Sequence, residues 1–203
     1  MPSSNSLIRS RKRQLRNQLT AREQSSHATA LCSQIRRLSA FLNSRRIACY
    51  LANDGEIDPK NIIQTAWNLR KQVYLPVLSP FQSKLYFAPY SAGMDMHINR
   101  FGIREPACRP VNWLTAWQLD LMLLPLVAFD ENGNRLGMGG GFYDRSLAYR
   151  HSRIHSLRPK LIGLAHELQR EDKLATNSWD IPLDLIATEQ RIIKGCENCR
   201  LGP

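Results

Sequence analysis

The residues with the clearest potential for chemistry lie in the stretch RLGMGGGFYDR, at positions 135–145. Four of the chain's eleven glycines fall within five positions there, between Arg135 and Asp144. Consecutive glycines allow backbone N–H groups to converge on an anion, and a helix that follows adds the positive end of its dipole. The pattern therefore predicts a loop that binds phosphate groups. The alternative is a tight turn whose glycines only permit close packing.

The side chains around these glycines suit the same ligand. Arg135 can hold a phosphate through two parallel N–H groups. Asp144, one turn into the expected helix, can ligate a magnesium ion that bridges phosphate oxygens. Phe142 and Tyr143 offer flat faces on which a ring can stack. The loop matches neither GxxxxGK[ST] nor GxGxxG, because no Lys-Ser or Lys-Thr follows and position 142 is phenylalanine.

Alternating helical and strand patterns surround this loop. Helical patterns cover 7–19, a segment that begins at Thr20 with a capping box, a segment from Asp58-Pro59 to about 70, and a segment from Phe142. Strand patterns cover 46–52, 72–78, 84–90, 119–129, 160–166 and 183–193. The order predicts one α/β domain over residues 1–203, with a three-layer arrangement in which helices cover both faces of a mostly parallel sheet. The most apolar strand, 119–129, is expected at its centre, and 194–203 is expected to be a polar tail.

Ligands of such sheets bind beyond the carboxyl ends of the strands. This rule places NDGEID (53–58), LPVLSP (75–80) and AFDENGNRLGMGGGFYDR (128–145) at one rim. The five histidines lack the sequence spacing of metal ligands, and His166, at the end of a strand, is the only one expected near the rim.

The net charge of +11 is concentrated at the beginning of the chain, where residues 1–46 hold ten of the 28 Lys and Arg but one of the 17 acidic residues. Such a segment is typical of a solvated helix, a mitochondrial presequence, or a surface for nucleic acid, membrane or a polyanionic small molecule. Leu7, Ile8, Leu15 and Leu19 share one helical face, which favours a helix docked on the core.

No apolar run approaches the roughly 18 residues that span a bilayer, so we expect no membrane association. The five cysteines are scattered and no secretory signal precedes them, which predicts reduced thiols and a cytoplasmic protein, with mitochondrial import as the alternative. Cys196 and Cys199 form a CxxC that lacks two further zinc ligands, and we expect it to be inert.

The longer stretch PLVAFDENGNRLGMGGGFYDR (125–145) resembles the signature of the 5-formyltetrahydrofolate cyclo-ligases, also called 5,10-methenyltetrahydrofolate synthetases. Weaker matches follow in the family's order at LANDGEID (51–58), KQVYLPVL (71–78), GIREP (102–106) and WDIPLD (179–184). The resemblance implies a fold similar to that of sugar-phosphate isomerases and CoA transferases. It also implies an ATP- and Mg²⁺-dependent enzyme that converts 5-formyltetrahydrofolate to 5,10-methenyltetrahydrofolate and releases ADP and phosphate.

The resemblance further implies a role for individual residues. It assigns ATP binding to Arg9, Arg13, Arg135, Leu136, Gly137, Met138, Gly139, Gly140, Gly141, Phe142 and Tyr143. It assigns folate binding to Leu51, Glu56, Met138, Gly139, Gly140, Gly141 and Phe142, and magnesium binding to Asp144 and Asp180. The lysine that many members carry four positions before the first arginine is Asn5 here. The implied partners are small molecules, and we expect a monomer that binds neither membrane nor nucleic acid.

This chemistry accounts for the absence of a Ser-His-Asp or Cys-His arrangement. The formyl oxygen is a poor leaving group until it is phosphorylated, and N10 of the same molecule is already adjacent for the attack. The protein must mainly hold ATP, neutralise its phosphates and seat the folate. Two other functions remain open on the sequence: an RNA- or polyanion-binding protein that uses the basic segment, and a sugar-phosphate isomerase or CoA transferase of the same fold. Dependence on magnesium and ATP distinguishes them.

Overall fold

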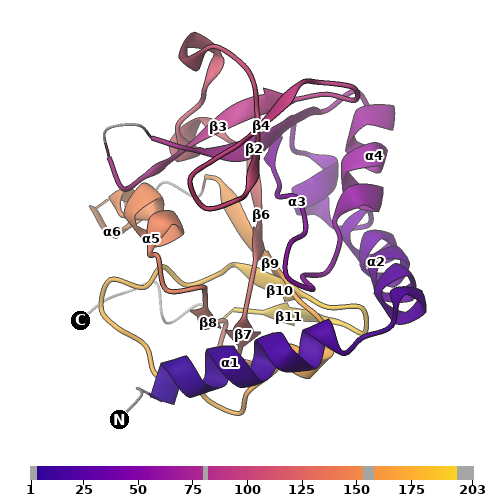
Figure 1. Ribbon diagram of the computed structural model, residues 1–203, viewed down its shortest axis with the longest axis vertical. Coiled ribbons are helices and arrows are strands. Elements are labelled where there is room, and N and C mark those ends of the chain that lie inside the picture. Colours follow the sequence, from indigo (N-terminus) through magenta and orange to yellow (C-terminus); the bar gives the residue numbers. More distant parts are fainter. Residues whose placement is uncertain (1–3, 80–81, 153–157, 196–203) are drawn as a thin grey trace.

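The fold was analysed in a computed structural model that describes residues 4–79, 82–152 and 158–195. Among these residues, seven strands form one sheet in the order β11-β10-β9-β6-β1-β2-β3 (Figure 1). Their bounds are β1 Arg46–Ala48, β2 Gln72–Leu78, β3 Leu85–Tyr90, β6 Leu121–Pro125, β9 Lys160–Leu164, β10 Leu185–Ala187 and β11 Ile192–Lys194. The inner strands run parallel, and β3 and β11 pair antiparallel at the two edges. The predicted mostly parallel sheet is confirmed.

The central strand is β6, as its apolar sequence predicted. The expected strand 119–129 is nevertheless divided. After Pro125 the chain leaves the sheet, and β7 (Ala128–Phe129) pairs with β8 (Arg135–Leu136) in a separate hairpin. This hairpin carries the glycine-rich loop away from the sheet on a short rigid support.

Helices cover both faces of the sheet, which confirms the three-layer arrangement. Leu121 and Leu123 pack in one buried cluster with residues of α2, α3 and α4, whereas Met122 and Leu124 pack in another with Leu147 of α5. Because successive strand residues point to opposite faces, burial on both sides requires the continuous apolar run of β6. The helices are α2 Ala21–Ile35, α3 Ser39–Leu42, α4 Lys60–Asn68, α5 Phe142–Leu147 and α6 Tyr149–Ser152.

Shorter elements complete the described chain. A second hairpin, β4 (Met96–Ile98) with β5 (Arg104–Pro106), extends from the β3 side. Three 3₁₀ turns are η1 Pro110–Asn112, η2 Ala116–Gln118 and η3 Glu167–Gln169. Within the described ranges, none of the helices combines the length and apolar character needed to cross a membrane.

Local sequence signals set the beginnings of two helices. The capping box before α2 is present: Thr20 Oγ1 accepts a hydrogen bond from Glu23 N at 3.3 Å, and Glu23 Oε2 accepts one from Thr20 N at 2.8 Å. Asp58 Oδ1 accepts a hydrogen bond from Lys60 N at 2.9 Å and so supports the first turn of α4. Both pairs satisfy N–H groups that have no partner within the helix.

The N-terminal helix, α1 (Ser4–Asn17), docks only in part through the residues that the sequence indicated. Leu7 and Leu15 are exposed, at 58% and 39%, whereas Lys12 and Arg16 are buried. Lys12 Nζ donates to Leu168 O at 2.8 Å, and Arg16 Nε donates to Asp54 O at 2.6 Å. The expected docking on the core is confirmed, and Ile8 packs against Ala128, Leu136 and Leu174. Leu7 and Leu15 were wrongly included, because carbonyl and carboxylate oxygens beyond the ends of the strands attract the cations of α1 inward instead. Figure 1 shows α1 lying across β7 and β8.

The strand order reverses direction next to β1, which is the position where α/β sheets form a crevice for their ligands. From β1 the chain continues to β2 on one side, whereas β6 lies on the other side of β1. Two segments leave the carboxyl ends of β1 and β6 at this position. They are residues 49–58 and 126–145, which contain the two motifs that the sequence singled out. Both motifs thus meet at the topological switch point.

Candidate functional site

The glycine-rich loop presents its backbone to solvent. Residues 137–140 are exposed, and Gly139 and Gly141 adopt left-handed φ values of +98° and +62°. Glycine adopts these values without the steric strain of a Cβ atom. Arg9 of α1 donates from Nε to Gly137 O at 2.8 Å, and a Cβ on Gly139 would lie 3.5 Å from Arg9 Cζ. The structure therefore brings the predicted Arg9 against the predicted loop.

Arg135 lies beneath this loop, and its side chain is only 8% exposed. Its guanidinium donates to Asp144 Oδ1 and to Ile181 O, so β8 is tied both to α5 and to the segment before β10. Burial lowers the pKa of Arg135, and the negative charges of Asp144 and Asp180 oppose that shift. The fold thus gathers three sequence-predicted residues, with the cation already paired to a carboxylate.

Asp144 and Asp180 are the two carboxylates that the sequence predicted as magnesium ligands. Asp144 uses Oδ1 for Arg135 and for the N–H of Ile181 at 3.4 Å, and its Oδ2 has no hydrogen-bond partner among the described residues. Asp180 Oδ2 accepts a hydrogen bond from Asn177 N at 2.8 Å and closes a turn. Magnesium prefers oxygen ligands of this kind and retains several waters, so one or two carboxylates suffice.

A buried arginine holds the opposite side of the crevice. Arg16 is fully buried; its Nη2 donates to Asp54 Oδ2 at 2.9 Å and its Nη1 to Leu126 O at 3.2 Å. Asp54 follows β1 and Leu126 follows β6, so one side chain fixes both exits of the switch point. Arg13 Nε also donates to Asp54 Oδ2, at 2.6 Å, and this hydrogen bond lowers the pKa of Asp54 to about 2. The structure places Arg13 on Asp54 rather than on the glycine-rich loop.

Glu56 is enclosed rather than displayed on a surface turn. Its side chain is 14% exposed, its Oε2 accepts a hydrogen bond from Asn53 N at 3.1 Å, and its Oε1 lies 3.9 Å from Arg16 Nη2. Burial raises the pKa of Glu56 to about 7, against the opposing charge of Arg16. Glu56 is therefore not a solvated turn residue, because the turn folds inward onto α1.

Two tyrosines complete the environment of this carboxylate. Tyr50 donates from its hydroxyl to Ile57 O at 2.7 Å. Burial raises the pKa of Tyr50 and of Tyr143, and the charge of Glu56 adds to both shifts. Glu56 therefore lies close enough to interact with the first turn of α5, across the crevice from its own strand. The sequence-predicted Glu56 and Tyr143 belong to one site.

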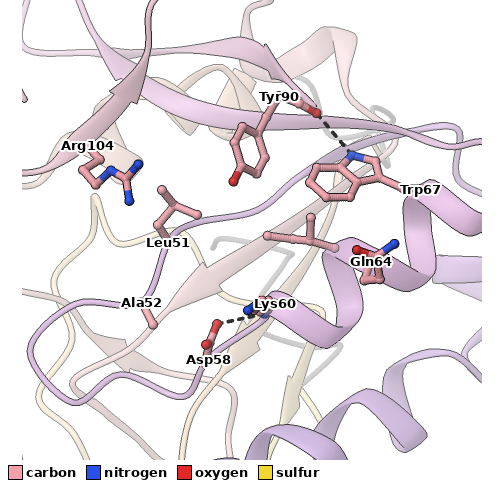
Figure 2. A pocket seen from close by; sticks show the side chains of 9 residues that line it. Leu51, Ala52, Asp58, Lys60, Gln64, Trp67, Tyr90 and Arg104 are labelled. Atoms are coloured by element: carbon pink, nitrogen blue, oxygen red, sulfur yellow. Dashed lines mark hydrogen bonds between the residues drawn. The ribbon is translucent and has the colours of Figure 1, made fainter. Parts of the chain in front are cut away.

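Leu51 lines a neighbouring cleft of about 300 Å³, near the lower limit for small-molecule pockets. Figure 2 shows Leu51, Trp67 and Tyr90 pointing into this space, with Lys60 and Arg104 at its margins. The Trp67 indole donates to Tyr90 O at 3.2 Å, and the two rings lie 5.4 Å apart. The cleft thus combines an apolar lining with two cations and the carboxylate of Asp58.

The β4–β5 hairpin reaches the glycine-rich loop from the side of this cleft. Phe101, at its tip, meets the ring of Phe142 edge-on with centroids 5.7 Å apart. Phe101 is itself 54% exposed, so its outer face remains available to a ligand. The hairpin therefore supplies a further wall to the site.

Several site residues were missed or misjudged in the sequence. Lys12 and Arg16 follow Ile8 at intervals of four, so the three residues lie on one face of the helix. This spacing indicates a buried face only if charged residues are accepted on it. The histidines lack the sequence spacing of metal ligands, but two of them meet in space: His27 Nδ1 and His166 Nδ1 lie 2.8 Å apart although 139 residues separate them. Cys196 and Cys199 lie outside the described residues.

Comparison with known proteins agrees with this geometry. The sequence matches the 5-formyltetrahydrofolate cyclo-ligase family over residues 2–189. A 5-formyltetrahydrofolate cyclo-ligase of Haemophilus influenzae is 42% identical over 87% of this chain and 92% of its own length. One from Escherichia coli is 37% identical over 89% and 97%. The solved structure of Aquifex aeolicus 5,10-methenyltetrahydrofolate synthetase superposes with a TM-score of 0.78 at 26% identity, over 95% of this chain and 93% of that one.

Proposed function

The chain belongs to the 5-formyltetrahydrofolate cyclo-ligase family, and on that premise we propose that it uses ATP and Mg²⁺ to convert 5-formyltetrahydrofolate to 5,10-methenyltetrahydrofolate. One observation carries the proposal. An exposed glycine-rich loop flanked by Arg9 and a largely buried carboxylate, Glu56, face the same switch point from opposite sides. The first suits a polyphosphate, and the second suits a heterocycle with N–H donors.

The phosphates of ATP bind at the loop 135–143. Backbone N–H groups there are free of Cβ crowding, and the beginning of α5 adds partial positive charge. Arg9 already contacts the loop, and Arg135 lies beneath it. Arg13 reaches the nucleotide only by giving up its hydrogen bond with Asp54, so its contribution is smaller than that of Arg9.

The folate lies with its pterin at Glu56 and its aminobenzoyl-glutamate arm along the cleft beside Leu51. A carboxylate can accept two hydrogen bonds from the amino and N–H groups of a pterin. The apolar lining at Trp67 and Tyr90 suits an aromatic ring, and Lys60 and Arg104 suit the terminal carboxylates. Met138 to Phe142 close the site between folate and nucleotide.

Asp144 and Asp180 hold the magnesium ion, which when bound neutralises negative charge on the phosphate oxygens. This role requires Arg135 to share Asp144 with the ion. Because Asp144 has a second oxygen without a hydrogen bond among the described residues, the sharing needs no disruption of the Arg135 pair. Arg135 then fixes the orientation of the carboxylate and keeps positive charge near the transferred phosphoryl group.

The reaction needs positioning more than acid–base catalysis. The formyl oxygen takes the γ-phosphoryl group from ATP, and ADP departs. N10 then forms a bond to the formyl carbon and loses its proton, while the carbon–oxygen bond breaks and phosphate leaves. Loop N–H groups, Arg9 and Arg135 hold the negative charge as it moves, and the seated folate holds N10 close to the carbon.

A direct assay tests the proposal. Near-ultraviolet absorbance should rise as the methenyl product forms, only when ATP and Mg²⁺ are both present. Removal of the metal with a chelator should stop the rise, and renewed Mg²⁺ should restore it. Turnover that persists after chelation would reject the metal requirement. Tight, strongly salt-dependent RNA binding without turnover would instead favour the polyanion-binding alternative. Against that alternative, the charges of Lys12, Arg13 and Arg16 in α1 are already paired with carboxylates.

A further inference from the structure

A second polar cluster also lies beyond the carboxyl ends of the strands, but at β9 and β10 rather than at the glycine-rich loop. Strands β9 and β10 are parallel neighbours in which Leu164 pairs with Ala187. His166 and Glu189 each follow two residues later and so emerge at matching positions beyond the carboxyl ends. His27, from α2, reaches the same point. The topology therefore brings together two imidazoles and a carboxylate that are far apart in the sequence.

The three side chains lie close enough together to reach one ion after small rotations. His27 Nδ1 lies 2.8 Å from His166 Nδ1, and one possible ligand atom from each of the three residues lies within 4.8 Å of the other two. His166 is fully buried, whereas His27 and Glu189 are partly exposed, so an ion could enter from solvent. In the part of the chain that the structure describes, no other group of three such side chains meets this criterion.

Neighbouring hydrogen bonds hold two of these residues in place. Glu189 Oε2 accepts a hydrogen bond from Glu167 N at 2.9 Å. His166 N donates to Gln169 Oε1 at 2.8 Å, and Gln169 in turn donates to Leu126 O at 2.6 Å. Metal ligands in proteins are usually oriented by such surrounding bonds, which lower the entropy lost when the ion binds.

We propose that His27, His166 and Glu189 bind a divalent transition-metal ion, and that zinc is the ion the site suits best. Two imidazoles and one carboxylate form a mixed nitrogen and oxygen set that leaves a fourth position for water, an arrangement typical of zinc. Coordination replaces the hydrogen bond between the two Nδ1 atoms, and the ring that donated it carries its hydrogen on Nε2 instead. The donor set differs from the all-oxygen set at Asp144 and Asp180, so the two sites prefer different metals.

The position of the cluster indicates what a bound ion would do. The ion would cross-link α2 to the ends of β9 and β10, beside Gly55 of the turn that carries Glu56. We therefore expect the bound ion to stabilise the contact between α2 and the ends of these strands.

The test uses the full-length chain carrying Cys196→Ser and Cys199→Ser, because tail thiolates would compete for the metal. Cobalt(II) is titrated into this parent protein at pH 7 and followed by visible absorbance, and zinc is then used to displace it. We expect one cobalt per chain and a thermal midpoint that rises with zinc. His27→Gln and Glu189→Gln should each weaken binding by about tenfold or more and remove the rise in midpoint.

His151→Gln provides the matched control, since His151 is an exposed histidine outside the cluster. It should bind cobalt as the parent does. The proposal is overturned if the folded parent does not bind cobalt or zinc, or if His27→Gln and Glu189→Gln bind as tightly as the parent. Thermal melts without metal verify that each variant is folded. Two variants on different elements keep the test decisive if one of them unfolds.

Discussion

The glycine-rich loop and the Glu56 turn face one crevice but use opposite physical means. Residues 137–140 are exposed and offer backbone N–H groups, with charge supplied by Arg9. The turn instead largely buries the carboxylate of Glu56 beside a buried arginine, Arg16. A polyphosphate is large and highly charged, so an open backbone surface suits it. Recognition of a neutral heterocycle gains more from a few desolvated groups, since their hydrogen bonds compete less with water.

The contrast has a consequence for stability. Substitutions at the exposed part of the loop should alter binding with little effect on folding. Substitutions at the turn should alter both, because Asp54 and Glu56 surround the charge of Arg16. Arg135 is the exception on the loop side, since it is buried and paired with Asp144. The predictions below test whether the two regions separate in this way.

Arg135→Ala should have the largest effect. Loss of a preorganised charge near the transferred phosphoryl group should lower kcat/KM by about 100-fold or more. The variant also leaves Asp144 and Ile181 O without their partner, which should cost about 3 kcal/mol of unfolding free energy. Steady-state kinetics and denaturant unfolding measure the two effects. Near-normal kinetics in a folded variant would remove Arg135 from the reaction and leave it a structural role only.

Glu56→Ala should raise the folate KM or lower kcat by about 30-fold, as expected for loss of charge-assisted hydrogen bonds worth roughly 2 kcal/mol. Glu56→Gln keeps the size and one acceptor, so its defect should be smaller. The ATP KM should hardly change in either variant. Folate is titrated at saturating ATP, and ATP at saturating folate. A change in the ATP KM alone would assign Glu56 to nucleotide binding rather than to folate binding.

The raised pKa of Glu56 predicts a pH-dependent stability. Between its ordinary value of 4.5 and its folded value of about 7, the native state binds more protons than the unfolded state. Stability contributed by this group is therefore present below pH 4.5 and is lost as the pH rises to about 7. Glu56→Gln removes the titration, so its stability relative to wild type should improve by on the order of 2 kcal/mol from pH 4.5 to 7.5. Urea unfolding across this range measures it. A constant difference would mean that Glu56 is not desolvated.

Arg9→Ala should have the smallest effect. Loss of one half-buried cation at the loop should raise the ATP KM about fivefold, or roughly 1 kcal/mol, and leave the folate KM and the unfolding free energy almost unchanged. Arg11→Ala is the control, because Arg11 lies on the same helix but pairs with Glu171 and is 60% exposed. Equal effects of the two substitutions would indicate a general charge effect of α1 rather than a contact at the loop.

Much of the frame could be predicted from sequence because its signals are local. The capping box at Thr20, the strand 72–78 and the helix that begins at Phe142 all depend on neighbouring residues. The central place of β6 followed from an apolar run that only burial on both faces requires. Boundaries were less well predicted: the strand expected at 46–52 ends at Ala48, and the run 119–129 is divided. The reason is that hydrogen bonding to other strands decides where a strand ends.

The sequence by itself determined the fold class and singled out the loop for which we propose phosphate binding, since glycine spacing and apolar alternation are properties of short segments. Only the tertiary structure decided which charges are buried. Arg16 turns inward because carbonyl and carboxylate oxygens of Asp54 and Leu126 meet it there. Glu56 is largely buried because its turn packs against the same helix. His27 contacts His166 although 139 residues separate them in the sequence. The energy of a charge depends on what surrounds it in space, and those surroundings come from distant parts of the chain.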